Sequence, residues 1–365
     1  SLLAVMAGVA PVGAAAGPAG PTDLVHRVEA EVARFLAENP RAPGVSVTVL
    51  CPPLGLDLDV AMGTVTQDRP EPLTPRHTYR IASNTKTYVA AAVLRLVEQG
   101  RLDLDDTLAD HLPTAFRELL EADGYATDRM TIGQVLAHTS GLAEHPGDDR
   151  YAAAIFADPQ HHWTRAEQLR LCCEWFDPVG APGERFAYSD TGYILLGEVI
   201  ERCTGQDLGA AVRELLDYDR LGLTATWWEE LEPRAPGAGP RAHQYIDGVD
   251  TFAMSPTMDL YGGGGLVSSV RDMAVFMRAL LAGEVLRDQA SLAAMTGQGT
   301  THYRLGLFST EAGGHHAFGH SGFWNTFALH FAALDLTIAG AITSHDAEPG
   351  RVLAGRIVEV LAAAP

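Results

Sequence analysis

Ser83 and Lys86 stand three positions apart in the stretch RIASNTKTYVAAAVLRL, residues 80–96. Lys86 is the only lysine of the chain, because the other 25 of its 26 Lys and Arg residues are arginine. Residues three apart lie on one face of a helix, so the two side chains can touch. A neutral amine can take the proton of a serine hydroxyl, whereas a guanidinium stays protonated at any working pH. The pattern therefore predicts Ser83 as a nucleophile with Lys86 as its partner.

This pair needs further residues to be specific, because short motifs also arise by chance. With 12 serines in 365 residues, a lone lysine meets a serine three positions upstream about 3% of the time. Tyr188 and Asp190, on a turn just before a predicted helix, are further residues that could act with Ser83 and Lys86. A phenol beside a lysine ammonium is expected to have a depressed pKa. It can then act as a base toward the nucleophile and as an acid toward the leaving group.

A third stretch, FGHSGF at 318–323, reads as a strand on which His320 and Gly322 face the same side. A glycine at such a position lets a substrate approach closely. The same letters come near the nucleophile elbow G-x-S-x-G, with Ser321 as the candidate nucleophile. The last glycine is missing and no helix follows, so an α/β-hydrolase is the weaker interpretation.

Three motifs resemble, in order and spacing, those of the serine β-lactamase and D-alanyl-D-alanine carboxypeptidase superfamily: Ser83-Asn84-Thr85-Lys86, Tyr188-Ser189-Asp190 and His320-Ser321-Gly322. The branch that looks most similar contains class C β-lactamases, R61-type DD-peptidases and related esterases. Accessory stretches at 135–142, 182–201 and 262–283 are similar to segments typical of that branch. The resemblance runs from about residue 30 to about residue 360.

This resemblance implies hydrolysis through an acyl-enzyme, with no metal or cofactor. Ser83 would be the acylated nucleophile, Lys86 its partner and Tyr188 the general base. The backbone N–H groups of Ser83 and Phe323 would form the oxyanion hole, and His320 would line the cleft. The fold implied is α+β, β-lactamase/DD-peptidase-like: an antiparallel sheet flanked by N- and C-terminal helices, with an inserted all-helical region.

Two departures from the family pattern bear on the substrate. Asp190 stands where the family usually has asparagine, and an ionised carboxylate can only accept hydrogen bonds, so a substrate amide would lose a donor. The carboxylate also favours protonated Lys86 and shifts the base role toward Tyr188. His320 stands where class C β-lactamases have lysine. In this respect the chain resembles the DD-peptidases and esterases instead. Phe323 and Trp324 make the adjoining wall apolar, which hints at a hydrophobic acyl or alcohol group.

The predicted function is therefore cleavage of an ester or a D-amino-acid peptide, of the DD-carboxypeptidase or esterase type. A β-lactamase is the alternative within the family. A penicillin-binding-like protein that holds cell-wall peptide without turnover is the alternative of another class. The histidines at 161, 162, 315, 316 and 320 lack HExxH or a matched carboxylate, so no metal site is predicted. His138 is expected to hydrogen-bond a turn near the cleft.

Alternating and helical periodicities indicate the elements that must position these residues. An amphipathic helix at 22–40 precedes a hairpin of strands at 44–50 and 56–66. Helices are predicted at 84–99, 114–122, 131–138, 165–176, 190–204 and 208–217, and a glycine turn, a short extended piece and another helix at 261–285. Strands at 303–310, 316–323, 326–334 and 336–344 and a helix at 350–362 complete the chain.

This order predicts three parts of the chain. Residues 1–22 form a leader, residues 23–82 and 260–365 an α/β sheet domain, and residues 83–259 a helical domain. The catalytic site is expected between the two domains, which work as one unit.

Composition narrows the partners and the compartment. The formal charge of −20 argues against binding to nucleic acid or to anionic membranes, and leaves a small-molecule or peptide substrate. The uncharged residues 1–22, with AAA at 14–16, resemble a secretion signal, with the signal peptide within residues 1–16, so the protein is expected to be exported. No other stretch is apolar enough to cross a bilayer. One disulfide is conceivable, from Cys203 to Cys172 or Cys173; otherwise these thiols and Cys51 are buried and free.

Overall fold

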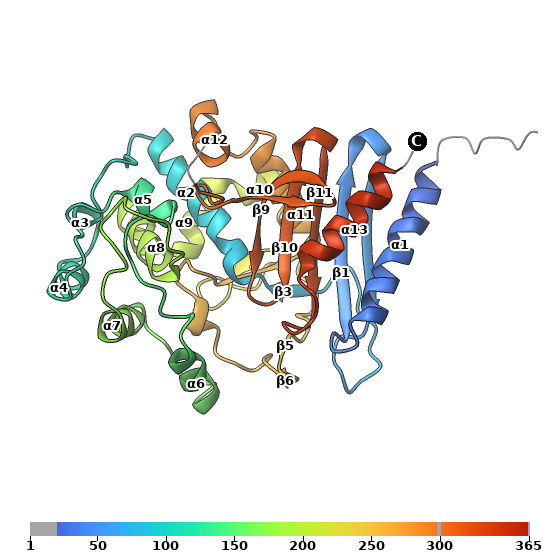
Figure 1. The fold of residues 1–365 in the computed structure, drawn as a ribbon, viewed down its shortest axis with the longest axis horizontal. Helices are drawn as coiled ribbons and strands as arrows, with labels where there is room; N and C mark the ends of the chain where they lie inside the picture. The colour runs from blue at the N-terminus through green and yellow to red at the C-terminus, as the bar shows by residue number, and fades with distance from the viewer. Residues whose placement is uncertain (1–19, 298–300, 364–365) are drawn as a thin grey trace, which may run out of the picture.

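The computed structural model describes residues 20–297 and 301–363, and its central feature is a six-stranded antiparallel sheet. The strands are β1 (Gly44–Cys51), β2 (Leu56–Gly63), β8 (Phe308–Ala312), β9 (His315–Gly322), β10 (Thr326–Phe331) and β11 (Leu336–Ile342). Their order in the sheet is β2-β1-β11-β10-β9-β8. Val45 lies opposite Ile342, so the N-terminal hairpin pairs directly with the last strand of the chain (Figure 1).

The two faces of this sheet carry side chains of different size. Large apolar side chains such as Val47, Phe327 and Ile338 face α1 (Pro21–Glu38) and α13 (Gly350–Ala362). Alanines at 328 and 339 belong to the core on the other side, where α11 (Val270–Leu281) packs against β1, β10 and β11. Since strand side chains alternate between faces, this pattern places two helices over one face and one helix over the other.

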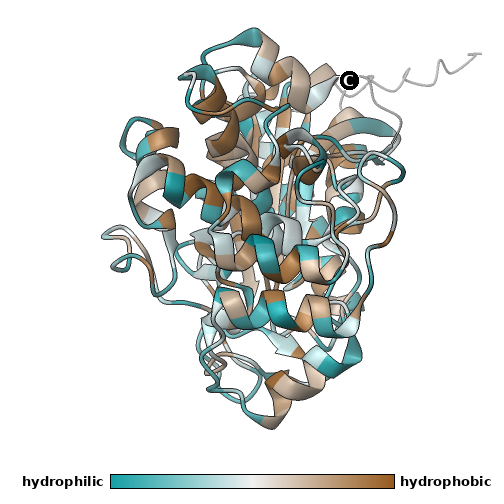
Figure 2. Ribbon diagram, turned by 90° about the vertical axis from the view of Figure 1, so that its left-hand side faces the viewer, coloured by the Kyte–Doolittle hydropathy of each residue, from teal (hydrophilic) through white to brown (hydrophobic). Residues whose placement is uncertain are grey.

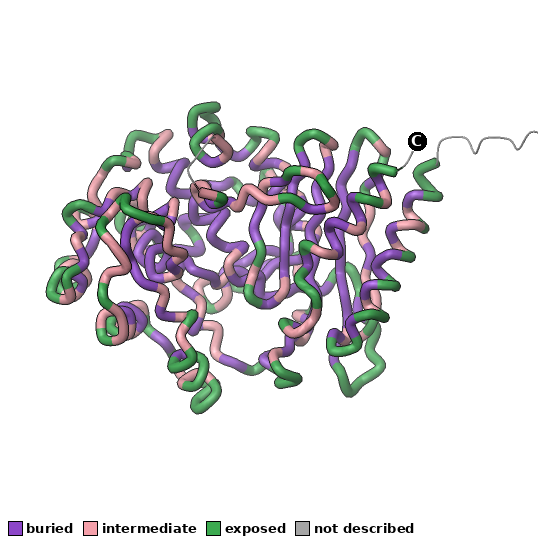
Figure 3. Tube along the Cα trace, viewed as in Figure 1, coloured by how far each residue is buried: buried purple, intermediate pink, exposed green. Residues whose placement is uncertain are grey.

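The segment between the two halves of the sheet is helical. Its helices are α2 (Thr85–Glu98), α3 (Leu108–His111), α4 (Thr114–Ala122), α5 (Ile132–Leu136), α6 (Asp149–Ala157), α7 (Arg165–Trp175), α8 (Asp190–Thr204), α9 (Leu208–Leu216) and α10 (Tyr218–Leu221). Helix α2 packs against α8 and α9, and every residue from 85 to 96 is buried (Figure 3). The helices around it mix hydrophobic and hydrophilic residues, as surface helices do (Figure 2).

A small second sheet leads into the catalytic region. Strands β3 (Thr78–Arg80), β7 (Leu266–Ser269) and β4 (Trp227–Trp228) form it in the order β3-β7-β4. A two-stranded sheet joins β5 (Tyr245–Ile246) to β6 (Val249–Asp250). Because β3 ends three residues before Ser83, its pairing with β7 fixes where α2 begins.

The predicted α+β fold is confirmed, and so are most of its elements. Helices α4 and α13 match their predicted positions, and α1, α2, α7, α8 and α9 do so within two residues. The strand predicted at 303–310 begins only at Phe308, as β8, because residues 304–307 form a turn in which Arg304 N–H donates to Leu307 O. Gly306 makes this turn at φ 75°. Helices α6 and α12 (Gln289–Thr296) were not predicted.

Other expectations concern the ends of the chain and the thiols. The predicted leader lies, up to residue 19, outside the described residues, so export stays a prediction. Within the described ranges, no helix combines the length and the apolar character that a bilayer span requires. All four cysteines are free: Cys51 and Cys172 are buried, and Cys173 and Cys203 are half-buried.

Candidate active site

Ser83 sits on a tight 3-10 turn, Ala82–Asn84, between β3 and α2. Ala82 adopts φ 44°, a left-handed conformation that is costly for a residue with a Cβ and is typical of constrained functional turns. Asn84 Nδ2 donates to Ile81 O at 3.1 Å and to Thr326 Oγ1 at 2.9 Å, and Thr326 Oγ1 donates to Ile81 O at 3.0 Å. These bonds fasten the turn to β10, so Ser83 is held against the sheet.

Gly322 makes this fastening possible from the neighbouring strand β9. A Cβ atom at Gly322 would lie 2.1 Å from Ile81 O and 2.6 Å from Thr326 Oγ1. The space that a side chain at position 322 would need is therefore taken by the backbone of the turn that carries Ser83. Gly322 still lines the cavity in front of Ser83.

Lys86 is fully buried, and its ammonium has three partners. Nζ donates to Ser83 Oγ at 3.0 Å and to Gly263 O at 2.6 Å, and it forms an ion pair with Asp190. An ammonium has three hydrogens, so all of them are used. Lys86 thus connects Ser83 directly to the Asp190 carboxylate.

The charges around Lys86 set its protonation state. Burial by itself lowers the pKa of Lys86, but Asp190, Tyr188 and Asp259 more than offset that effect and raise the pKa above its ordinary value. Lys86 is therefore an ammonium at neutral pH. Accepting the proton of Ser83 requires that it first or simultaneously gives one away.

Tyr188 stands two residues before Asp190, the first residue of α8, and His138 holds it in place. His138 O accepts from Ala187 N–H at 2.8 Å, and His138 Nδ1 accepts from Ser189 N–H at 3.1 Å. The rings of His138 and Tyr188 lie 4.2 Å apart. The prediction that His138 hydrogen-bonds a turn near the cleft is confirmed.

The protonation state of Tyr188 differs from the expected one. Burial raises the pKa of the phenol, and this effect together with the Asp190 charge exceeds the lowering by Lys86. The predicted depression of the Tyr188 pKa is wrong, because it considered the ammonium without the burial. Tyr188 is a neutral phenol at rest, 5.0 Å from Lys86 Nζ to the ring centre.

His320 is buried beside the same cleft and has partners at both nitrogens. Its Nδ1–H donates to Ser321 O at 2.7 Å, so Nε2 accepts from the Tyr303 hydroxyl at 3.1 Å. Burial, with a further contribution from Lys86, lowers the pKa of His320 to about 3. His320 is thus a neutral wall residue rather than a cation, while Ser321 itself is exposed.

The predicted site residues meet at one cavity of about 710 Å³. Ser83, Tyr188, Asp190 and the stretch 320–324 all line it. Phe323 is 53% exposed at its rim, whereas Trp324 is buried. Three segments that are distant in the sequence therefore supply one site, as the motifs predicted.

Two carboxyl groups at this cavity were not predicted. Glu144 Oε2 accepts from Asp190 N–H at 2.5 Å, and Asp259 also lines the cavity. Burial and the Asp190 charge raise the pKa of Glu144 well above its usual range and that of Asp259 to about 7. No motif marks either residue, since only the folded chain brings them to Asp190. Across residues 20–297 and 301–363, no three His, Cys, Asp or Glu side chains are placed to hold a metal ion.

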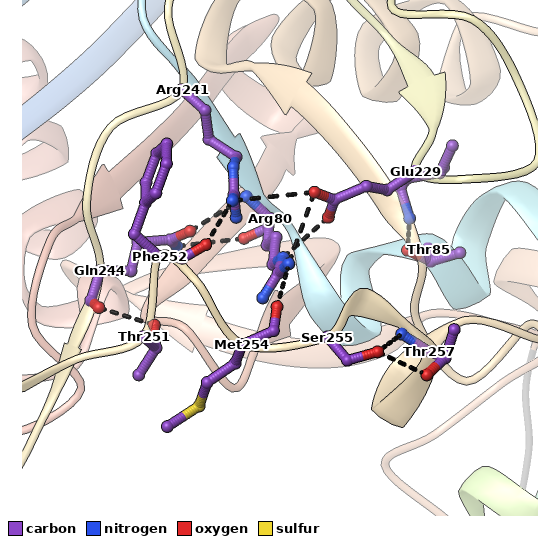
Figure 4. Close-up of polar contacts among 11 residues, drawn as sticks. Arg80, Thr85, Glu229, Arg241, Gln244, Thr251, Phe252, Met254, Ser255 and Thr257 are labelled. Atoms are coloured by element: carbon purple, nitrogen blue, oxygen red, sulfur yellow. Dashed lines mark hydrogen bonds and ion pairs between the residues drawn. The ribbon is translucent and has the colours of Figure 1, made fainter. Parts of the chain in front are cut away.

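A polar network joins the nucleophile strand to one wall of the cavity (Figure 4). Arg80, at the end of β3, pairs with Glu229 at 2.7 Å and donates through Nη2 to Met254 O at 2.7 Å. The Gln244 side chain accepts from Arg80 N–H at 3.0 Å and donates to Arg80 O at 3.1 Å. The segment around Met254 is therefore fixed relative to Ser83.

Known proteins are similar to this chain in sequence and in fold. A provisionally named D-alanyl-D-alanine carboxypeptidase of Escherichia coli (strain K12) is 30% identical over 243 residues, which are 60% of this chain and 54% of that protein. The chain spans about half the length of the curated relatives it matches.

Solved structures show the same fold over nearly the whole chain. A D-stereospecific amidohydrolase from Streptomyces sp. has a TM-score of 0.77 at 24% identity, over 92% of this chain and 97% of that one. The D-amino acid amidase from Ochrobactrum anthropi SV3, complexed with L-phenylalanine amide, has a TM-score of 0.77 at 22% identity, over 93% and 99%. The family model described as Beta-lactamase matches residues 32–362. With the three motifs assembled around one cavity, the chain belongs to the beta-lactamase family.

Proposed function

We propose that the protein cleaves an ester or an amide of a D-amino acid through an acyl-enzyme on Ser83. The observation that carries this proposal is the position of Lys86 Nζ, which contacts both Ser83 Oγ and the Asp190 carboxylate. That arrangement gives the serine proton a route away from the nucleophile. The similar amidohydrolase and amidase folds support the same class of bond.

The first step is attack of Ser83 Oγ on the substrate carbonyl carbon. The hydroxyl proton passes to Lys86 Nζ while Lys86 gives a proton to Asp190. Lys86 therefore keeps one positive charge throughout this step. The carbonyl oxygen becomes an oxyanion, which the N–H groups of Ser83 and Phe323 stabilise. An asparagine at position 190 could not accept that proton, so the carboxylate has a role that the usual family residue lacks.

The second step is loss of the leaving group. Tyr188 is a neutral phenol and can donate its proton to the departing oxygen or nitrogen as the carbonyl reforms. The proton held by Asp190 returns through Lys86 to the phenolate, which restores the pair for hydrolysis of the acyl-enzyme. Water then attacks the acyl carbon, and its proton follows the same route back to Ser83.

Two features favour esters and simple amides over β-lactams and carboxypeptidase substrates. Asp190 can offer no donor to a substrate amide carbonyl, which costs about 1–3 kcal/mol when that group is buried unpaired. A DD-carboxypeptidase must also accept a C-terminal carboxylate in the leaving group. His320, the neutral residue at the third motif, offers such a charge no ion pair.

Intact mass spectrometry of the protein during turnover tests the proposal. The full chain is incubated separately with p-nitrophenyl acetate, D-phenylalanine amide and benzylpenicillin, and both protein and small molecule are followed. We expect hydrolysis of the ester or the amide, a transient acyl adduct on Ser83, and neither in Ser83→Ala. Ser291→Ala on α12, remote from the cavity, is the matched control.

The other outcomes each identify a different function. Consumption of benzylpenicillin with no hydrolysis of ester or amide would identify a β-lactamase. A lasting benzylpenicillin adduct on Ser83, without turnover of any of the three compounds, would identify a DD-peptidase-like site. Full activity of Ser83→Ala would overturn the assignment of the nucleophile.

A further inference from the structure

Large apolar side chains are exposed at only three positions in the described part of the chain: Phe156, Val249 and Phe323. Phe156, on α6, and Phe323, after β9, are 44% and 53% exposed, and both line the cavity that contains Ser83. Val249 does not line it. Single exposed apolar residues are common, but two aromatic rings at the rim of one catalytic cavity form a surface that a ligand can cover.

The interior of the cavity continues this apolar surface. Tyr151 and Ile155, on the same helix as Phe156, line it together with Met254, Met258 and Trp324. Tyr151, Met254, Met258 and Trp324 form one buried cluster with Ala82, the residue before Ser83. The apolar wall thus reaches the nucleophile turn itself.

This apolar wall is held in place by hydrogen bonds. The Tyr151 hydroxyl donates to Met258 O at 2.8 Å, and Arg80 Nη2 donates to Met254 O at 2.7 Å. Arg80 lies at the end of the strand that leads to Ser83 (Figure 4). A preformed wall binds a ligand without the cost of ordering a loop.

Carboxyl groups outnumber the side chains of lysine and arginine along this cavity. Glu144, Asp190 and Asp259 line it, and the buried ammonium of Lys86 is already shared among Asp190, Ser83 and Gly263. Arg351, an exposed side chain, is the one arginine among the described residues that line the cavity. A ligand carboxylate near Ser83 would therefore meet carboxyl groups rather than a free cation.

We propose that this cavity is a subsite for substrates that carry a bulky apolar group and no carboxylate, with Phe156, Phe323, Met254 and Met258 as its contacts. The substrate class is an apolar ester or amide whose head group is neutral or cationic. This inference rests on the proposed function. It specifies which esters and amides the proposed site would accept. Phe156 and Phe323 become the residues that determine specificity.

Calorimetric binding to the Ser83→Ala protein tests the subsite without turnover. The probes share one apolar body and differ in the head group: 4-phenylbutyramide, 4-phenylbutylamine and 4-phenylbutyrate, with acetamide as the probe that lacks the apolar group. We expect the amide and the amine to bind at least about tenfold more tightly than the carboxylate and acetamide. Equal or tighter binding of the carboxylate, or binding of acetamide as tight as that of the phenyl amide, would overturn the proposal.

Rim variants locate the binding in the cavity. Phe156→Ser and Phe323→Ser, each combined with Ser83→Ala, should weaken 4-phenylbutyramide binding about fivefold to tenfold. Val249→Ser, the third exposed apolar residue, is the matched control and should leave binding unchanged. Unaltered binding in both rim variants would overturn the proposal even if the wild-type protein hydrolyses esters. The reverse result, binding without any hydrolysis by the wild type, would overturn the proposed function alone.

Discussion

Lys86 Nζ donates a hydrogen bond of 3.0 Å to Ser83 Oγ from a side chain that has no exposed surface. Bulk water does not contact such an ammonium, so within one turnover a proton that leaves Lys86 must go to a neighbouring residue. Asp190, its ion-pair partner, is the available carboxylate. This relationship makes the chemistry of Ser83 dependent on the identity of residues 86 and 190.

Replacing Lys86 by arginine tests whether a positive charge at position 86 is sufficient for hydrolysis. Lys86→Arg keeps the charge but cannot release a proton at working pH, so kcat/KM for p-nitrophenyl acetate should fall by at least about 10²–10⁴. Arg95→Lys, the opposite exchange in the same buried helix, should retain activity. Melting curves followed by circular dichroism should show that both variants are folded. Activity within a few-fold of the wild type in Lys86→Arg would contradict the proton route.

Tyr188→Phe distinguishes an acid from a base. A p-nitrophenolate leaving group departs without a proton, whereas an alkoxide or an amine needs one. We therefore expect kcat for an alkyl ester or an amide to fall by about 10²–10³, and kcat for the p-nitrophenyl ester to fall much less. Steady-state kinetics with the two leaving groups measures the difference. Equal losses for both would instead assign Tyr188 as the base that activates Ser83.

Asp190→Asn should create a pH dependence. Asp190 is the largest contribution that raises the pKa of Lys86, so its removal lowers that pKa. Without the carboxylate, Lys86 must lose its proton to solvent before it can accept one from Ser83. The kcat/KM of the variant should be low at pH 7 and rise about tenfold per pH unit up to the Lys86 pKa. A profile that overlays that of the wild type would exclude Asp190 as the proton acceptor.

Gly322→Ala should disturb the nucleophile although it touches no reacting atom. The added Cβ would lie 2.1 Å from Ile81 O, so the turn that carries Ser83 must move. We expect a loss of about 10²-fold in kcat and a decrease of about 1–3 kcal/mol in the free energy of unfolding. Gly20→Ala, where no atom lies within 4 Å of the added Cβ, is the control. Unchanged kcat would show that the turn tolerates the displacement.

Asp259→Asn should change how stability depends on pH. The pKa of Asp259 is raised from its usual 3.8 to about 7 in the fold, so the folded protein binds a proton there that the unfolded chain has released. Stability therefore falls as pH rises from about 4 to about 7. Relative to the wild type, the variant should gain up to about 1.4 kcal/mol per pH unit over this range and then level off. Urea unfolding at pH 5, 6, 7 and 8 measures this difference, and a constant difference would contradict the raised pKa.

Local patterns account for much of the fold. Helix α13 was predicted at its observed residues because its apolar spacing is regular and it begins directly after Pro349. The turn at 304–307 was missed because Tyr303, Leu305 and Leu307 alternate as in a strand. Apolar residues do alternate here, and Tyr303 and Leu307 are buried. They are not, however, part of a strand of the sheet.

The three motifs were sufficient to predict that one site contains five parts of the chain: Ser83, Lys86, Tyr188, Asp190 and the stretch 320–324. The types of these residues and their order in the sequence carry this prediction. Spacing could not show that Glu144 and Asp259 join them. These two residues belong to no motif, and they meet Asp190 only when three segments distant in the sequence are packed together. Spacing also could not show the neutral state of Tyr188, because burial depends on the surrounding side chains.

The sequence by itself determined the chemistry: one lysine, three residues after a serine at the start of a helix, and a carboxylate where an amide is usual. Only the tertiary structure decided the electrostatic balance and the shape of the cavity. Both depend on distances between residues far apart in the chain, and on how much water the packing excludes from between them.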